Sequence, residues 1–328
     1  MTNATESAKL RWAILGCARI SRRGLIPGIL GSHSGSLDLL ASRRADAARE
    51  WASEFGIPRT ADSYEAALAD PVIDAVYIPL ANEEHAPFVK AAADAGKHIL
   101  CEKPLALDGA EARSMVEYCR SKGVVLMEAF MWRHQPRTKA LLADVRSGRI
   151  GDLRLIRSSF SFPIDPGDWR LDPARGGGSL WDVGCYGVST VRLFACQEPS
   201  DILGHARFSE RGVDMTLAAT FKFPSGVTGV IDCSFEQPFR CVYELVGTAG
   251  SVIVPDAYLP GDAPVARFYD LDGKLTDEVV YDGRNQYACM VDAFAEGVRS
   301  GQLPAPAEDG LAQMTALDAV LTACRSSA

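Results

Sequence analysis

The sequence lacks an excess of basic charge, and it lacks any apolar run long enough to cross a membrane. Its 34 lysine and arginine residues are outnumbered by 42 aspartate and glutamate residues, which gives a formal net charge of −8. We therefore expect no nucleic-acid partner. A membrane helix needs about 20 consecutive apolar residues, and no segment approaches that length. The polar start, Met1 to Lys9, lacks the pattern of a secretory signal peptide, so we expect a soluble, cytoplasmic protein.

Paired cysteines are also missing. The nine cysteines are scattered, and none belongs to a C-x-x-C pair. Most lie inside apolar runs, as Cys101, Cys119 and Cys196 do, which predicts reduced, buried thiols in the cytoplasm. The cysteines and the five histidines show no spacing typical of metal ligands, so we expect no metal site.

A chain of 328 residues exceeds what one hydrophobic core usually supports, so we expect two domains. In the first third, short apolar runs alternate with helical patterns. Strands are predicted at residues 12–15, 37–41, 75–78, 98–101 and 124–127, and helices at 21–30, 45–55, 63–69, 84–95 and 108–122. This alternation indicates a parallel sheet covered on both faces, and therefore an α/β, doubly wound, Rossmann-like domain over residues 1–128.

The pattern changes after about residue 130. Helices are predicted at 136–147, 179–195, 286–299 and 310–324, with a long strand at 153–162 and β-rich segments over 201–280. This indicates a second α/β domain, residues 129–328, with an open, mostly antiparallel sheet. A sheet without a second covering layer buries its open face against a twin, so we expect a homodimer or homotetramer.

The turn after the first predicted strand occupies the place of a dinucleotide-binding fingerprint, G-x-G-x-x-G. It reads Gly16-Cys17-Ala18-Arg19-Ile20-Ser21, where only the first of three expected glycines is present. Glycines in this place let backbone amides approach a pyrophosphate at the start of a helix. Ala18 and Ser21 are the smallest replacements for the other two. The alternative is an ordinary turn between a strand and a helix.

The end of the second predicted strand reads Ser42-Arg43-Arg44, with no carboxylate directly after it. A site for NAD usually places Asp or Glu near this point to bind the ribose hydroxyl groups. A hydroxyl and two guanidinium groups instead suit a 2′-phosphate, which predicts NADP in preference to NAD. The alternative is that both arginines simply begin a surface helix.

Two further segments carry residues suited to chemistry. Glu102 and Lys103 follow the strand at 98–101, at the end where α/β enzymes bind ligands. The segment from Gly176 to Tyr186 runs through three glycines into a helix, on which Asp182 and Tyr186 share one face. The alternatives are an exposed loop with a charged pair for the first segment, and a core tyrosine bonded to a helical aspartate for the second.

Taken together, these residues suit the oxidation of an alcohol. Hydride transfer from a carbinol also requires loss of the hydroxyl proton, and Tyr186 is the candidate acceptor. Bringing the pKa of a tyrosine from about 10 towards 7 requires roughly 4 kcal/mol. A nearby ammonium group such as that of Lys103 supplies part of this in a partly desolvated cleft. Asp182 is expected to orient the substrate hydroxyl or to hold Lys103.

These segments resemble the Gfo/Idh/MocA oxidoreductase family over nearly the whole chain. The most specific markers are Glu102-Lys103-Pro104 and the segment Gly176–Tyr186, in a branch that has tyrosine where other members have histidine. The resemblance implies that Lys103 and Tyr186 flank the nicotinamide, that Asp182 lines the substrate pocket, and that the Lys103–Pro104 bond is cis. It also implies further cofactor contacts, namely Pro79, Leu80, Asn82, His85, Trp169 and Arg170.

The sequence therefore predicts an NADP-dependent oxidoreductase that acts on a sugar or a cyclic diol. A ketoreductase of a nucleotide-linked keto sugar is a second enzyme hypothesis, because it shares the lysine and tyrosine. A non-catalytic regulator that senses a cofactor is a third hypothesis, which the joint presence of Lys103, Asp182 and Tyr186 disfavours. The substrate pocket is expected at the open sheet and near Asp165, Asp168, Arg170 and Tyr186.

Overall fold

The computed structural model describes residues 8–326 and contains two compact units. Of the described residues, the first unit takes in 8–106, 110–135 and 285–311, and the second takes in 107–109, 136–284 and 312–326. The boundary predicted from the sequence, between residues 128 and 129, differs from this division mainly because it leaves residues 285–311 in the second domain. Residues 1–7, on which the signal-peptide prediction mostly rests, lie outside the described residues.

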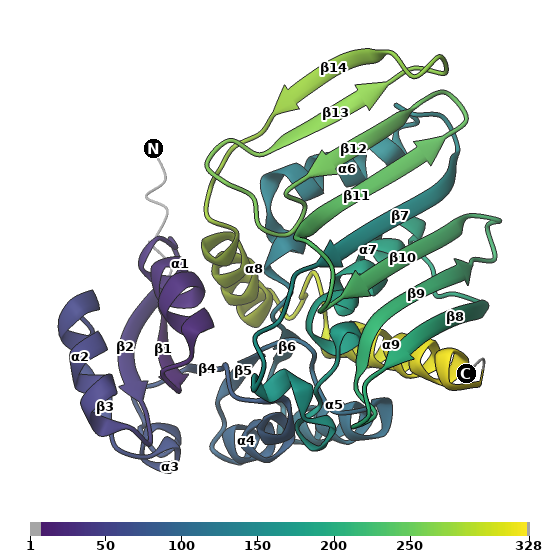
Figure 1. The fold of residues 1–328 in the computed structure, drawn as a ribbon. Helices are drawn as coiled ribbons and strands as arrows, with labels where there is room; N and C mark the ends of the chain where they lie inside the picture. The colour runs from purple at the N-terminus through teal and green to yellow at the C-terminus, as the bar shows by residue number, and fades with distance from the viewer. Residues whose placement is uncertain (1–7, 327–328) are drawn as a thin grey trace, which may run out of the picture. The chain divides into compact units, whose positions relative to one another are not determined.

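The first unit is built on a six-stranded, fully parallel sheet with the strand order β3-β2-β1-β4-β5-β6 (Figure 1). Its strands are β1 (Leu10–Leu15), β2 (Gly35–Ala41), β3 (Arg59–Ala61), β4 (Ala75–Ile78), β5 (His98–Cys101) and β6 (Leu126–Glu128). The helices between them are α1 (Ile26–Leu30), α2 (Ala45–Phe55), α3 (Tyr64–Leu68), α4 (Asn82–Asp94) and α5 (Gly109–Lys122). The order is that of a doubly wound Rossmann sheet, so this prediction is confirmed.

Burial explains which strands the sequence pattern finds. Strands β4 and β5 are buried along nearly their whole length, and each coincides with its predicted range. Continuous apolar runs of this kind are typical of central parallel strands. The pattern does not predict β3, whose residues Arg59, Thr60 and Ala61 are only partly covered at the edge of the sheet. An edge strand needs no apolar run, and short polar edges are common.

Helix α8 (Gln286–Ser300) belongs to the first unit although it follows the whole second sheet in sequence. The ring of Tyr287 lies against Gly24, where an added Cβ would come within 2.7 Å of it. The Asp292 carboxylate accepts a hydrogen bond from the backbone N–H of His33 at 2.9 Å. Phe294 packs on Trp12, with ring centroids 5.1 Å apart. This packing lies far beyond the reach of local sequence patterns.

The second unit contains an eight-stranded sheet with the order β14-β13-β12-β11-β7-β10-β9-β8. Its strands are β7 (Leu153–Ser161), β8 (Asp201–Phe208), β9 (Asp214–Lys222), β10 (Thr228–Ser234), β11 (Arg240–Gly247), β12 (Ser251–Pro255), β13 (Val265–Tyr269) and β14 (Leu275–Val280). Only β7 and β10 pair in parallel, and the remaining pairs are antiparallel. The prediction of a mostly antiparallel sheet is therefore confirmed.

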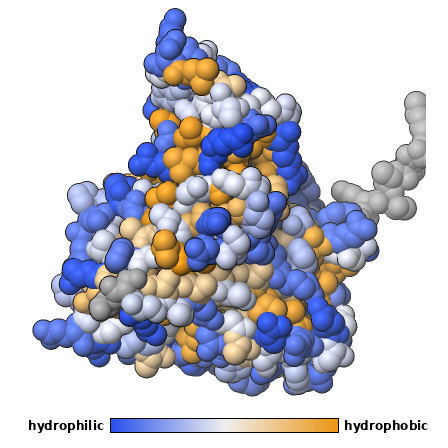
Figure 2. All heavy atoms as spheres, turned by 90° about the vertical axis from the view of Figure 1, so that its right-hand side faces the viewer, coloured by the Kyte–Doolittle hydropathy of each residue, from blue (hydrophilic) through white to orange (hydrophobic). Residues whose placement is uncertain are grey.

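Helices α6 (Pro136–Arg146) and α7 (Cys185–Ala195) lie on one side of this sheet, behind it in Figure 1. Helix α9 (Ala307–Ser326) begins in the first unit and continues in the second. Burial alternates along β11, as expected for a sheet with one covered face. Exposed apolar side chains include Leu203 on β8 and Val280 on β14. The face drawn in Figure 2 shows hydrophobic residues as several separate groups among hydrophilic ones.

Eight of the nine cysteines are buried, and all nine are free thiols. Cys196 is the exception to the predicted burial, because it is exposed. It ends α7 in a left-handed backbone conformation, with φ of 52°, so its side chain does not continue the buried face of the helix. Within residues 8–326, no helix combines the length and the apolar character needed to cross a membrane.

Candidate functional site

The carboxyl ends of the parallel strands in the first unit bring several predicted site residues to one edge of the sheet. Gly16 follows β1 with φ of +127°, a conformation that side chains rarely adopt. A Cβ added there would lie 3.1 Å from Leu80 Cδ2 and 3.4 Å from the Tyr64 hydroxyl. Glycine therefore leaves open a narrow space between the ends of β1 and β4. A pyrophosphate can approach the backbone closely only if such a space is not filled by a side chain.

The remaining fingerprint residues follow this turn into a helix. Arg19 and Ile20 are helical, and Ser21–Leu25 forms a π-helical turn ahead of α1. The Ser21 hydroxyl, which occupies the third glycine position, donates to the Gly16 carbonyl at 3.3 Å. Ala18 lies between the strand and the helix and is partly covered. Serine at position 21 is thus accommodated by closing the turn with its own hydrogen bond.

Arg44 connects the ends of β1 and β2. Its guanidinium group donates to the Cys17 carbonyl at 3.0 Å, and its backbone N–H donates to the Ser42 hydroxyl at 3.0 Å. Burial raises the pKa of the Cys17 thiol, so this side chain stays neutral. These contacts bring Cys17, Ser42 and Arg44 together at the ends of β1 and β2.

Arg43 is exposed and forms an ion pair with Glu84, with 2.9 Å between Nη1 and Oε1. Its guanidinium carbon also lies 5.3 Å from the centre of the Tyr64 ring. The hydrogen bond to Glu84 is the main reason that the pKa of Arg43 is raised. Sequence reasoning did not find Glu84 or Tyr64, because only the tertiary structure places α3 and α4 beside Arg43. A phosphate at this edge would compete with Glu84 for the guanidinium group.

Glu102 is buried at the end of β5 and accepts a hydrogen bond from the Tyr77 hydroxyl. Burial, reinforced by the Glu102 charge, raises the pKa of Tyr77 well above its usual value, so the phenol remains a donor. The Glu102 carboxylate also accepts from the backbone N–H of Lys103 at 3.2 Å. The Lys103–Pro104 bond is cis, as the resemblance implied. Glu102 therefore holds the start of the loop that carries Lys103.

Residues 79–85 pass the same edge of the sheet. The ring of His85 is fully buried, with Nε2 3.1 Å from the Leu80 carbonyl oxygen and Nδ1 3.1 Å from that of Pro104. Burial lowers the pKa of His85. The imidazole thus ties the segment with Pro79 and Leu80 to the one with Lys103 and Pro104. Asn82 begins α4 and is buried.

In the second unit, Arg170 lies between two carboxylates. Its Nε is 2.9 Å from Asp182 Oδ1, and its Nη1 is 3.2 Å from Asp168 Oδ1. Burial lowers the pKa of Arg170, but the two carboxylates more than offset this, so the pKa is raised overall. The indole of Trp169 lies 4.7 Å from the guanidinium carbon of Arg170. The structure thus brings Trp169, Arg170 and Asp182 together within one unit.

The glycine-rich segment before Asp182 is packed tightly. A Cβ on Gly177 would overlap the Arg170 carbonyl oxygen and lie 2.7 Å from that of Asp172. Beyond it, the Asp214 carboxylate accepts from the Ser179 hydroxyl and the Leu180 N–H, each at 2.7 Å. Burial raises the pKa of Asp214 to about 6. Sequence reasoning did not find Asp214, because it lies on β9 and no local pattern relates it to this segment.

Tyr186 lies in the first turn of α7, directly after the π-helical turn Leu180–Gly184 that carries Asp182. Its side chain is buried, with 6% of its surface exposed. Its ring packs against Tyr258, with centroids 4.8 Å apart, and against Phe160, with centroids 5.5 Å apart. Turns of π-helix inside helices often mark functional sites.

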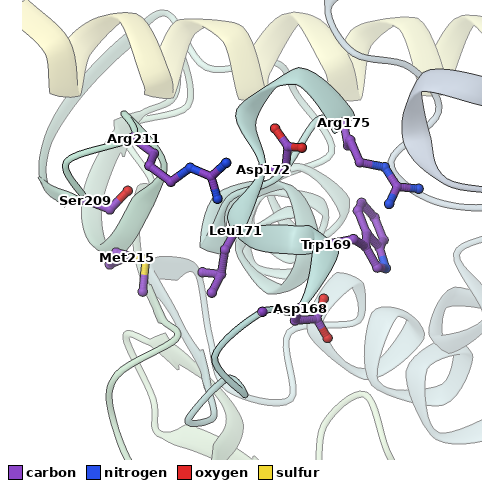
Figure 3. Close-up of a pocket in the computed structure, with 9 residues that line it drawn as sticks. Asp168, Trp169, Leu171, Asp172, Arg175, Ser209, Arg211 and Met215 are labelled. Atoms are coloured by element: carbon purple, nitrogen blue, oxygen red, sulfur yellow. The ribbon is translucent and has the colours of Figure 1, made fainter.

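A cavity of about 390 Å³ opens beside this segment (Figure 3). The residues that line it are Gly167, Asp168, Trp169, Leu171, Asp172, Arg175, Ser209, Arg211 and Met215. Figure 3 shows the Arg211 guanidinium group extending toward Asp172, while that of Arg175 lies beside the indole of Trp169. Of the residues expected at the substrate pocket, Asp168 lines this cavity, whereas Asp165, Arg170 and Tyr186 do not.

Lys103 belongs to the first unit and Tyr186 to the second, so their meeting beside a nicotinamide stays a prediction. Within residues 8–326, no group of three or more His, Cys, Asp or Glu side chains is arranged to hold a metal ion.

Comparisons with known proteins assign both parts of the chain to one family of oxidoreductases. Residues 10–130 match the model for the oxidoreductase family with an NAD-binding Rossmann fold, and residues 138–253 match the GFO/IDH/MocA C-terminal domain. The chain is 36% identical to D-xylose 1-dehydrogenase (NADP⁺) 2 of Haloferax volcanii, over 97% of this chain and 98% of that one. It is 34% identical to mouse trans-1,2-dihydrobenzene-1,2-diol dehydrogenase, over 78% of each chain.

Among solved structures, the chain is similar to a 3-ketoreductase from Actinomadura kijaniata in complex with NADP and TDP-benzene. The TM-score is 0.88 at 32% identity, and the match covers 96% of this chain and 98% of that one. The predicted resemblance is confirmed, and the chain belongs to the Gfo/Idh/MocA family of oxidoreductases.

Proposed function

We propose that the chain is an NADP-dependent dehydrogenase that moves a hydride between the nicotinamide and a carbinol or carbonyl carbon of a sugar or a cyclic diol. The observation that carries this proposal is the pair Asp182 and Tyr186, one turn apart, with Asp182 ion-paired to Arg170 and Tyr186 packed in an aromatic cluster. The D-xylose and dihydrodiol dehydrogenases to which the chain is similar support the substrate class.

The edge of the first sheet offers the groups that a dinucleotide needs. The open space at Gly16 and the helix start after Ala18 suit the pyrophosphate, with Cys17, Arg19 and Ile20 beside it. Ser42, Arg43 and Arg44 suit a 2′-phosphate. Glu102, Lys103 and the segment Pro79–His85 line the same edge, and we assign Trp169 and Arg170 to the cofactor from the second unit. The bound nicotinamide supplies or accepts the hydride.

Residues of the protein transfer the proton that accompanies the hydride. In the oxidation direction, the Tyr186 phenolate oxygen accepts the hydroxyl proton as the hydride leaves the carbinol carbon. The Lys103 ammonium group favours the ionised phenol, which brings the pKa of Tyr186 closer to neutral pH. Asp182, oriented by Arg170, accepts a hydrogen bond from a substrate hydroxyl. In the reduction direction, the same phenol returns the proton to the alkoxide.

A second candidate is the reduction of a nucleotide-linked keto sugar. The structural similarity to a ketoreductase bound to TDP-benzene and NADP supports it. So does the cavity of Figure 3, because Arg175 and Arg211 are the kind of side chains that bind phosphate groups. The same cavity also contains Asp168 and Asp172, which suit the hydroxyl groups of a free sugar.

Turnover decides between these candidates. The full chain is assayed at 340 nm with NADP(H) against free pentoses and hexoses, cyclic diols, and a dTDP-linked keto sugar. Turnover of a free aldose or a diol supports the first candidate, turnover of the nucleotide-linked sugar alone supports the second, and no turnover with any of them supports a cofactor-sensing regulator. Tyr186→Phe and Lys103→Met are each expected to lower kcat by about 10²- to 10⁴-fold. Near-native kcat in both variants would refute the assigned roles.

We also propose that two copies associate through the open face of the second sheet to form a homodimer or, by further pairing, a homotetramer. The exposed side chains Leu203 on β8 and Val280 on β14 support this, because apolar groups on a sheet face favour burial against a partner. A monomeric mass by light scattering would contradict the assembly.

Eight buried free thiols fit a reducing, cytoplasmic location.

A further inference from the structure

We propose that Tyr258 is a positioning residue for Tyr186, holding its ring in the orientation that proton transfer requires. The inference rests on the proposed function, in which Tyr186 exchanges the proton. Tyr258 lies after β12, more than seventy residues beyond Tyr186 in sequence, and both belong to the second unit.

The contact between the two rings is direct. The Tyr258 ring lies 4.8 Å from the Tyr186 ring, with an angle of 35° between their planes. It also stacks on Phe160 at 5.5 Å and 24°, while Phe160 lies 5.5 Å from Tyr186. The three rings thus contact one another pairwise. Tyr258 is fully buried, so it supports the Tyr186 ring from the side of the protein interior.

A chain of hydrogen bonds also connects the Tyr258 hydroxyl to the backbone carbonyl of Tyr186. The Thr190 hydroxyl donates to the Tyr186 carbonyl oxygen at 2.8 Å, which uses the single proton of that hydroxyl. The Tyr258 hydroxyl, 2.7 Å from Thr190 Oγ1, must therefore be the donor in that pair. Its own proton is then in use, so Ser158, 2.6 Å away, donates to Tyr258. Each hydroxyl in the chain thus donates to the next group, from Ser158 on β7 through Tyr258 and Thr190 to the Tyr186 carbonyl in the first turn of α7.

The segment that carries Tyr258 is itself fixed. The guanidinium group of Arg137, on α6, is buried and donates to four carbonyl oxygens at 2.9 to 3.1 Å. These carbonyls belong to Pro255, Asp256, Ala257 and Val265. The backbone N–H of Ala257 donates to the Cys241 carbonyl at 3.0 Å. Tyr258 is therefore held by the backbone that directly precedes it, by its hydroxyl and by its ring.

Tyr258 does not compete with Tyr186 for the role of base. Burial strongly raises the pKa of Tyr258, so its phenol stays neutral at every pH at which the protein is assayed. A neutral phenol with its only proton directed at Thr190 can orient a neighbour but cannot accept a proton from a substrate. Its effect on the rate thus passes through Tyr186.

The test compares variants that remove the hydroxyl or the ring. Tyr258→Phe keeps the ring and is expected to lower kcat about threefold to tenfold. Tyr258→Leu removes the ring support and is expected to lower kcat about 100-fold, since small misplacements of a reacting group cost rates of this order. The KM for NADP should stay within about twofold. The apparent pKa of kcat/KM should rise, because a misplaced Tyr186 returns toward its ordinary value near 10.

Tyr243→Leu is the matched control. Tyr243 is equally buried and lies beside Tyr258, with centroids 6.3 Å apart, but it packs on Phe194 rather than on Tyr186 in the described contacts. Equal losses of kcat in Tyr243→Leu and Tyr258→Leu would overturn the proposal. If Tyr258→Leu does not fold, Tyr258→Phe and Thr190→Val replace it, and native kcat in both would also overturn it.

A double variant separates this inference from the proposed function. If Tyr258 acts through Tyr186, adding Tyr258→Leu to Tyr186→Phe should lower kcat by less than about twofold. A further 100-fold loss would show that Tyr258 acts by another route. Native kcat in Tyr186→Phe alone would instead refute the proposed function, whatever Tyr258→Leu does.

Discussion

The turn after Gly16 in the first unit and the segment from Gly176 to Tyr186 in the second unit share a local pattern. Each leads from glycine into a π-helical turn, Ser21–Leu25 in one and Leu180–Gly184 in the other. They differ in what holds them. The first turn is closed through backbone carbonyls, since Gly16 N–H donates to the Ala41 carbonyl at the end of β2 and Ser21 donates to the Gly16 carbonyl.

The glycine-rich segment of the second unit is held instead by side chains that come from other elements. Asp214 on β9 binds its start, Arg170 binds Asp182, and Tyr258 supports Tyr186. We conclude that the Rossmann turn is held largely by backbone contacts, whereas the candidate catalytic helix depends on side chains from several other elements. Substitutions distant in sequence should therefore affect the segment in the second unit far more than the turn in the first.

The strongest test of this comparison is Gly177→Ala. The new methyl group would overlap the Arg170 carbonyl and displace the turn that carries Arg170, the ion-pair partner of Asp182. We expect a destabilisation of about 1–3 kcal/mol, as for other overpacked sites, and a loss of about 100-fold in kcat. Both are measured by urea unfolding and by steady-state rates. Gly261→Ala is the control, because no atom lies within 4 Å of its added Cβ. Equal behaviour of the two variants would contradict the tight packing.

Asp214→Asn tests the buried carboxylate. Because burial raises the pKa of Asp214 from 3.8 to about 6, the folded protein binds this proton more tightly than the unfolded chain. The resulting stabilisation is complete below about pH 4 and is lost as the pH rises to about 6, with a total of at most about 3 kcal/mol. The asparagine variant should lack this dependence. The measurement is the difference in the free energy of unfolding between wild type and variant from pH 4 to 7.

Asp201→Asn, at an exposed aspartate on β8, serves as the control for that experiment. If the difference between wild type and Asp214→Asn does not change with pH, the carboxylate does not titrate as the burial requires.

The smallest expected effect concerns the first unit. Arg43→Ala should lower the ratio of kcat/KM for NADP over NAD by about tenfold, because one charge-assisted hydrogen bond to the 2′-phosphate is lost. The matched control is Arg49→Ala, which removes an exposed arginine paired with Asp46 on α2. An unchanged ratio in Arg43→Ala would show that Arg43 does not select NADP and only forms a surface ion pair with Glu84.

Sequence patterns predicted the first unit well because its strands are buried on both faces and its helices repeat between them. The predicted helix 45–55 coincides with α2, and the strands 75–78 and 98–101 coincide with β4 and β5. They did not predict β3, a short polar edge strand, or the packing of α8 into the first unit. They also suggested burial for Cys196, which is exposed at the end of α7.

The sequence by itself determined the class of fold, the family, and the residues Lys103, Asp182 and Tyr186 as the candidate chemistry, because periodicity and short motifs are local properties of the chain. Only the tertiary structure decided which groups surround the candidate site residues: Arg170 beside Asp182, Tyr258 beside Tyr186, and Glu84 beside Arg43 of the candidate cofactor site. These contacts join residues that are 12 to 72 positions apart, and their energies come from burial and charge pairing. No pattern within a short window of sequence contains that information.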